Sequence, residues 1–97
     1  FGGFTNGKKL SALCELNHID IAPHHDCYIH APLVASTPSG RIVESFDNER
    51  DPLQAELFEN PHEMNNGWMH LNEKPGLGLE ISNTALKKFG KLVYKNK

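Results

Sequence analysis

The sequence predicts an α/β fold in which short parallel strands alternate with helices. Two short apolar runs, at residues 19–22 and 41–46, are separated by a helical stretch. A strand–helix–strand connection of this kind brings the two strands into parallel pairing. Parallel strands need neighbours on both edges and helices on both faces. Two strands alone do not meet that need, so the sequence predicts a piece of a larger α/β fold.

The first predicted element is a helix that begins near Thr5, because a threonine side chain can accept an unpaired N–H group at a helix N-terminus. One face of this helix carries residues at spacings of three and four, namely Leu10, Leu13, Cys14 and Asn17. Cys14 lies among leucines and is therefore predicted to be a small core residue.

The two predicted strands frame a second helix and a turn. Pro23 ends the first strand, because proline has no N–H for a ladder hydrogen bond. A helix is predicted over residues 29–36, and Pro32 fits this helix only within the first turn, where a missing N–H costs nothing. The residues Thr-Pro-Ser-Gly at 37–40 predict a turn before the second strand.

The chain is predicted to consist of two segments. Residues 1–46 carry the alternation of helices and strands, whereas residues 47–97 are richer in polar and proline-containing stretches. The second segment is predicted to wrap around the rest of the fold, because 97 residues suffice for one domain at most.

Short elements are predicted within the second segment. A short amphipathic stretch precedes Asn-Asn-Gly at 65–67, which predicts a hairpin with a type I′ turn. Residues 75–81 predict a loop that runs into an extended segment, and Ser82 is placed to cap a last helix. His62 and His70 have no partner at motif spacing and are predicted to be surface or packing residues.

Composition and charge argue against two classes of function. The net charge of -2 and the isoelectric point of about 6.3 argue against a nucleic-acid-binding protein, which usually carries a basic surface. No apolar run approaches the ~20 residues of a membrane-spanning helix. The two cysteines, Cys14 and Cys27, are too few for a disulfide scaffold and lack the Cys-x-x-Cys spacing of a redox or zinc motif. A reducing, cytoplasmic compartment is therefore expected.

A cluster of histidines follows the first predicted strand. His24 stands just beyond the strand, where parallel α/β folds place their active sites, and an imidazole there can act as a general base near neutral pH. Two alternatives remain open. His24, His25 and His30 could ligate a transition metal together with Asp26 or Cys27, or they could be hydrogen-bonded loop residues.

Glu44 lies near the end of the second predicted strand. A carboxylate beside apolar residues is costly unless it is paired, solvated or used in chemistry. Because parallel strands end at the same edge of a sheet, Glu44 is expected to face the same opening as His24, and the two form a candidate acid/base pair. The alternative is an edge-strand glutamate in water.

Four segments together resemble the C-terminal quarter of the enolase superfamily, in its mandelate racemase/muconate lactonizing enzyme branch. They are Gly-Gly-Phe-Thr at 2–5, Ile-Ala-Pro-His at 21–24, Ile-Val-Glu at 42–44, and residues 67–81, which include Pro-Gly-Leu-Gly-Leu-Glu-Ile. The segments occur in the family's order and spacing. The resemblance implies the last part of a modified TIM barrel, (β/α)7β, with a tail that returns toward a capping domain outside this chain.

The resemblance also implies a chemistry for the candidate residues. His24 takes the place of the general acid/base in a His–Asp dyad, and Glu44 takes the place of a protonated glutamate that donates to the substrate carboxylate. His25, Asp26 and His30 are expected to contact substrate or to support the residues that do. The family's Mg²⁺ ligands and the dyad Asp would lie in a preceding part of the protein, so no metal ligand is assigned in this chain, which alone should be inactive.

The expected reaction is removal of the proton α to a carboxylate, with an enolate stabilised by Mg²⁺. An acid-sugar dehydratase is the first expectation, and a racemase, epimerase or cycloisomerase of the same superfamily is the alternative. A small histidine-rich module that binds a transition metal is the alternative from another class. The expected partner is a small carboxylate such as a sugar acid, and the complete protein is expected to form a homo-oligomer.

Overall fold

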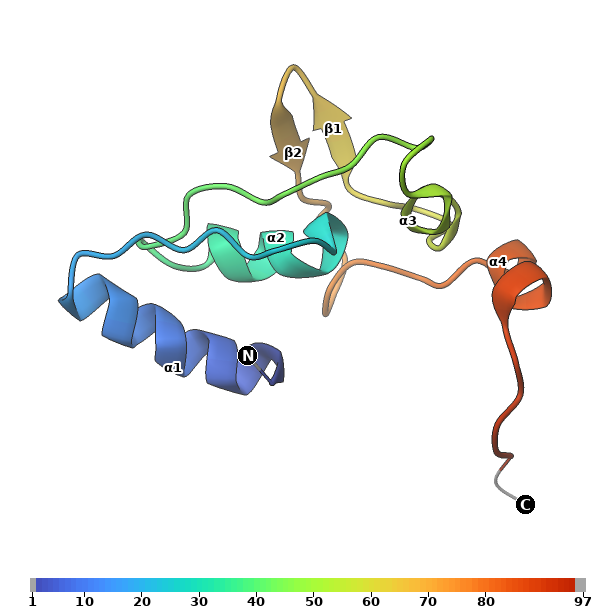
Figure 1. Ribbon diagram of the computed structural model, residues 1–97, viewed down its shortest axis with the longest axis horizontal. Helices are drawn as coiled ribbons and strands as arrows, with labels where there is room; N and C mark the ends of the chain where they lie inside the picture. Colours follow the sequence, from blue (N-terminus) through green and yellow to red (C-terminus); the bar gives the residue numbers. More distant parts are fainter. Residues whose placement is uncertain (1, 96–97) are drawn as a thin grey trace.

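The computed structural model describes residues 2–95, which form a series of short elements joined by long connections (Figure 1). In chain order these are α1 (Gly3–Leu16), α2 (Cys27–Ala35), α3 (Pro52–Glu56), β1 (Glu63–Asn65), β2 (Trp68–His70) and α4 (Asn83–Phe89). Residues 1, 96 and 97, at the outer ends of the two predicted segments, lie outside the described residues.

Helix α1 begins earlier than the sequence predicts. Its N-cap is Gly2, whose φ of 80° is a conformation that glycine adopts without steric cost. Thr5 therefore lies inside the first turn, and the prediction of a threonine cap is wrong. The buried residues of α1 are the small Gly7 and Ser11, and the Ser11 hydroxyl donates to the Gly7 carbonyl at 2.8 Å.

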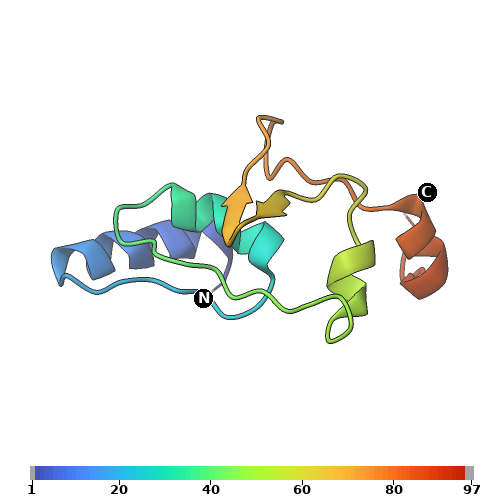
Figure 2. The same cartoon turned by 90° about the horizontal axis from the view of Figure 1, so that it is seen from above.

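Helix α2 lies beside α1, in contact with it, and also begins earlier than predicted (Figure 2). Asp26 adopts a left-handed conformation with a φ of 46°, which turns the chain into the helix at Cys27 instead of residue 29. Pro32 consequently lies inside the helix, and its predicted place in the first turn is wrong. The proline removes the N–H that would otherwise donate to the Tyr28 carbonyl.

The two predicted strands pair at a single point. Ile21 and Gly40 form a parallel bridge, in which the Ile21 N–H donates to the Ser39 carbonyl at 2.7 Å and the Arg41 N–H donates to the Ile21 carbonyl at 3.1 Å. The predicted parallel direction is confirmed. The predicted strands at 19–22 and 41–46 are wrong in extent, because residues 2–95 supply no further strand beside them to continue a ladder.

Strands β1 and β2 form the hairpin that Asn-Asn-Gly predicts. They pair antiparallel with Asn65 opposite Trp68, which leaves Asn66 and Gly67 as a two-residue turn. The φ angles of these two residues are 51° and 79°, and a type I′ turn requires positive φ at both positions. The predicted hairpin is confirmed.

The second segment closes with a short bridge and a capped helix. Phe58 and Ile81 form an antiparallel bridge, so the extended segment predicted after the loop is paired at a single position. The Ser82 hydroxyl accepts a backbone N–H from the first turn of α4 at 3.3 Å, so its predicted role as a cap is also confirmed. Lys88 of α4 lies 2.7 Å from the carboxylate of Glu56 in α3.

These elements leave much apolar surface uncovered. The accessible surface is 7530 Å², whereas a compact protein of this mass exposes about 5,600 Å². The radius of gyration is 15.1 Å, and about 12.5 Å is typical of a compact chain of this length. Cys14 is only partly buried, so its prediction as a core residue is wrong. Exposed apolar side chains include Leu13, Leu16, Leu92, Val93 and Tyr94.

Within residues 2–95, no helix combines the length and the apolar character that are needed to cross a membrane.

His62 is a packing residue. Its side chain is buried, its ring lies 6.4 Å from the Tyr28 ring, and its Nδ1 accepts the Asn72 N–H at 3.4 Å. Burial lowers the pKa of His62 below its ordinary value, because the protonated ring would lose its hydration. His70, in contrast, is exposed on β2.

We expect the segment around His62 to loosen as the pH falls below about 6.5, the ordinary pKa of histidine. Above this pH, His62 is neutral whether the segment is packed or open, and packing is at its most stable. Below this pH, His62 binds a proton in the open form but not in the packed form, so the stability of packing falls. The fall ends when the pH reaches the lowered pKa of the packed form, where His62 binds a proton in both forms. Hydrogen exchange at residues 58–72, corrected for intrinsic rates, measures the effect.

The variant His62→Asn should remove this pH dependence, because the Asn side-chain oxygen can replace Nδ1 as an acceptor and does not titrate. The exposed His70 provides the matched control, and His70→Asn should leave the pH dependence in place. A pH profile that is the same in the parent and in His62→Asn would show that another group controls the segment.

Candidate active site

His24 and Glu44 lie together beyond the Ile21–Gly40 bridge. The Nε2 atom of His24 is 3.5 Å from Oε2 of Glu44. The His24 side chain is 85% exposed and that of Glu44 is 43% exposed, so both are accessible to a bound molecule. The structure therefore brings together the two residues that the strand-end argument pairs.

A backbone group holds the Glu44 carboxylate. The His25 N–H donates to Oε2 of Glu44 at 2.9 Å. His25 and Asp26 adopt φ angles of 57° and 46°, which are uncommon for residues other than glycine. Because these two residues have left-handed backbone conformations, the chain changes direction between His24 and helix α2. The His25 N–H consequently points toward the Glu44 carboxylate.

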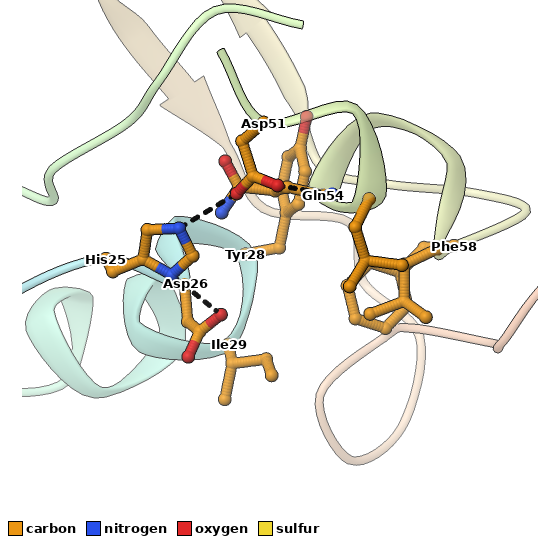
Figure 3. Close-up of a pocket in the computed structure, with 9 residues that line it drawn as sticks. His25, Asp26, Tyr28, Ile29, Asp51, Gln54 and Phe58 are labelled. Atoms are coloured by element: carbon orange, nitrogen blue, oxygen red, sulfur yellow. Dashed lines mark hydrogen bonds and ion pairs between the residues drawn. The ribbon is translucent and has the colours of Figure 1, made fainter. Parts of the chain in front are cut away.

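The His25 ring lies between two carboxylates (Figure 3). Its Nε2 is 2.8 Å from Oδ2 of Asp51, and its Nδ1 is 3.2 Å from Oδ1 of Asp26. The ring of Phe46 packs against it with a centroid distance of 5.3 Å. His25 is therefore held by side chains from three different parts of the chain.

Asp51 is the site residue that the sequence analysis missed. Its Oδ1 accepts the Gln54 N–H at 3.1 Å, which makes it the N-cap of α3, and Pro52 follows at the first helical position. An Asp-Pro pair is a known helix start. That signal could have located the helix, although it would not have identified His25 as the partner of Asp51.

His30 contacts the backbone of the same loop. Its Nδ1 donates to the His25 carbonyl at 2.7 Å, since a carbonyl oxygen can only accept. His30 thus fastens the loop to helix α2, whereas Asp26 extends from the loop with an exposed side chain. His25 contacts both Glu44 and Asp26, so these three residues form one contact network. His30 contacts this network through the His25 carbonyl.

Cys27 is buried beneath this loop. Its thiol donates to the Ser45 hydroxyl at 3.7 Å, and its side chain is inaccessible to solvent. Burial raises the pKa of the Cys27 thiol, chiefly through the loss of hydration of the thiolate. Cys27 is consequently a packing residue and a poor nucleophile or metal ligand.

A small cavity lies beside the His25–Asp51 contact. Its volume is about 60 Å³, which is room for a few water molecules. It is lined partly by Tyr28, Gln54 and Phe58 (Figure 3). Burial raises the pKa of the Tyr28 hydroxyl, so this group stays protonated near neutral pH. The cavity is too small for a sugar acid.

The described residues do not form a metal site. Within residues 2–95, no group of three or more His, Cys, Asp or Glu side chains is arranged to hold a metal ion. The rings of His24 and His25 are 6.0 Å apart, and His30 directs Nδ1 to a backbone carbonyl. Neither the transition-metal alternative nor the Mg²⁺ that the resemblance implies finds a ligand set in this part of the chain.

Comparison with protein families identifies the class. The family described as enolase C-terminal domain-like matches residues 1–85, so the chain belongs to that family. Its relatives are members of the mandelate racemase/muconate lactonizing enzyme superfamily, as the sequence resemblance predicts. The overall fold is therefore the α/β fold of an enolase C-terminal domain, consistent with part of a TIM-barrel-type enzyme.

Two curated proteins and one solved structure illustrate the similarity. A D-galactonate dehydratase family member from Musicola paradisiaca is 34% identical over 96 residues, covering 91% of this chain and 22% of that protein. D-galactarolactone cycloisomerase from Agrobacterium fabrum is 32% identical, over 91% of this chain and 26% of that protein. A mandelate racemase/muconate lactonizing enzyme from a marine actinobacterium, in complex with magnesium, is 28% identical with a TM-score of 0.76, over 82% of this chain and 23% of that one.

The chain thus spans about a quarter of the length of these proteins.

Proposed function

We propose that this chain supplies the closing part of the active site of an acid-sugar dehydratase, an enzyme that removes the proton α to a carboxylate. The observation that carries the proposal is the approach of His24 and Glu44 to 3.5 Å, beyond two segments that pair in parallel. Both are residues to which the family resemblance assigns the chemistry. The similarity to dehydratase family members supports dehydration as the reaction.

His24 is proposed as the general acid/base. Its exposed Nε2 can take the α-proton or give a proton to the departing β-hydroxyl. Its Nδ1 contacts no carboxylate within residues 2–95, and we assign that nitrogen to the dyad Asp, which would precede this chain. A carboxylate there would orient the ring and fix its tautomer.

Glu44 is proposed to hold the substrate carboxylate. Its Oε2 already accepts the His25 N–H. The Oε1 atom is then the oxygen that would carry a proton toward the substrate, in the manner that the resemblance implies. Elimination of water across the α and β carbons gives an enol, which becomes an α-keto acid.

The rest of the protein is proposed by the same reasoning. We assign residues 1–46 to the last strand–helix units of a (β/α)7β barrel and residues 47–97 to a segment that packs on the barrel and its capping domain. We assign Mg²⁺ ligands to residues outside this chain, as a magnesium complex of a similar protein suggests. A homo-oligomer in the cytoplasm is proposed, and the two free cysteines suit a reducing compartment.

The test begins with the intact mass of the native protein, which should be several times the 10.9 kDa of this chain. The protein is then incubated with Mg²⁺ and a panel of acid sugars, and α-keto acid formation is measured. Exchange of the α-proton with deuterated water, without α-keto acid, would indicate a racemase or epimerase instead. Conversion of a lactone without α-keto acid would indicate a cycloisomerase. Absence of both exchange and conversion across the panel would overturn the proposal.

A further inference from the structure

We propose that Asp51 is a positioning residue that acts through His25 to hold the Glu44 carboxylate beside His24. The inference rests on the proposed function, because it names a determinant of the same site. It goes beyond that function because Asp51 belongs to the second segment of the chain, residues 47–97, and not to the strand ends that carry His24 and Glu44.

The first step concerns the His25 backbone. The His25 N–H donates to Glu44 at 2.9 Å while His25 adopts a φ of 57°. A left-handed conformation is unfavourable for a residue with a β-carbon. His25 therefore needs contacts that oppose its relaxation to an ordinary conformation.

The second step concerns what supplies those contacts. The His25 ring is 36% exposed, and its Nε2 lies 2.8 Å from Asp51, whose side chain is 16% exposed. Asp26 also contacts the ring, but it belongs to the same turn and has a more exposed side chain. Asp51 is thus the carboxylate that contacts the ring from a separate element, and its Oδ2 is buried with no hydrogen-bond partner among the described residues.

The third step concerns the rigidity of Asp51 itself. One of its oxygens caps α3 through the Gln54 N–H, and Pro52 restricts the backbone directly after it. The guanidinium of Arg50 lies 4.8 Å from the centre of the Phe46 ring, which in turn packs on His25. The segment before α3 is therefore fixed to the loop at two points, through Asp51 and through Phe46.

The variant Asp51→Asn separates the contact with His25 from the helix cap. Asn caps helices as well as Asp does, so α3 should persist while the carboxylate opposite the His25 ring is lost. Glu49→Gln is the matched control, because it removes one negative charge from an exposed position in the same segment. Both variants are made in the complete protein, and thermal melting verifies that both remain folded.

Hydrogen exchange of the His25 amide gives a readout that does not depend on activity. In Asp51→Asn we expect the exchange rate at His25 to rise by about an order of magnitude, whereas Glu49→Gln leaves it unchanged. If Asp51→Asn fails to fold, His25→Asn replaces it. Asn accepts a positive φ but lacks the ring, and the same rise is expected. An unchanged exchange rate at residue 25 would overturn the inference.

Kinetics then link the contact to Glu44. We expect Asp51→Asn to lower kcat roughly tenfold or more, with a smaller change in KM, since small displacements of catalytic groups are costly. If Asp51 acts through Glu44, the double variant with Glu44→Gln should be no slower than Glu44→Gln alone. Additive losses would overturn the inference and leave the proposed function intact. Wild-type activity of Glu44→Gln would instead overturn the proposed role of Glu44, and the exchange experiment would still decide the role of Asp51.

Discussion

On the proposed function, replacing His24 with Asn is expected to lower the turnover of the complete protein by roughly two to four orders of magnitude, the usual contribution of general acid/base catalysis. Asn keeps a polar group of similar size but cannot exchange a proton near neutral pH. Because the His24 side chain is 85% exposed, its loss should leave the free energy of unfolding almost unchanged. Steady-state α-keto acid formation and thermal melting measure the two effects separately.

His18→Asn is the matched control for this experiment. His18 is also exposed and has a φ of 54°, which Asn tolerates, so the substitution should alter neither turnover nor stability. Equal turnover in His24→Asn, His18→Asn and the parent protein would exclude His24 as the acid/base.

Replacing Gly40 with Ala is expected to destabilise the protein by about 3 kcal/mol, near the upper end for an overpacked site. An added β-carbon would lie 2.7 Å from the carbonyl carbon of Val34 and closer still to its oxygen. Both are backbone atoms at the end of α2, so the clash cannot be relieved by a side-chain rotation. Gly40 also forms the bridge with Ile21, and moving it away would break that pairing. Urea-induced unfolding measures the loss.

Gly76→Ala is the comparison for Gly40→Ala. Gly76 has a φ of 70° but open space around its β-position, so only the backbone conformation is penalised, by about 1 kcal/mol. If the two variants were equally destabilised, close packing against Val34 would not be the reason why residue 40 must be glycine.

Local chemistry explains which elements could be predicted from the sequence. The type I′ turn at Asn66-Gly67 and the Ser82 cap depend on residues within a few positions of one another, and both are confirmed. The strands at 19–22 and 41–46 depend on hydrogen bonds to distant segments. Only the Ile21–Gly40 bridge is formed within residues 2–95, so their apolar character did not suffice to define their extent.

In the candidate site, too, some features could be predicted from the sequence and others depend on contacts between distant segments. His24 and Glu44, which were both predicted at the ends of parallel strands, do lie together. Asp51 could not be predicted as a site residue, because nothing in a sequence states that the cap of a later helix will face a particular histidine. The start of α2 was missed for a related reason: Asp26 turns the chain by a left-handed conformation that is rarely expected of a residue other than glycine.

The consecutive positive φ angles at His25 and Asp26 limit which side chains these positions can carry. Glycine, asparagine, aspartate and histidine tolerate this backbone, whereas branched residues such as valine and isoleucine are strongly disfavoured. The main chain thus selects a small set of residues before any substrate is considered. Variants at residues 25 and 26 should therefore be drawn from that set if the loop is to keep its conformation.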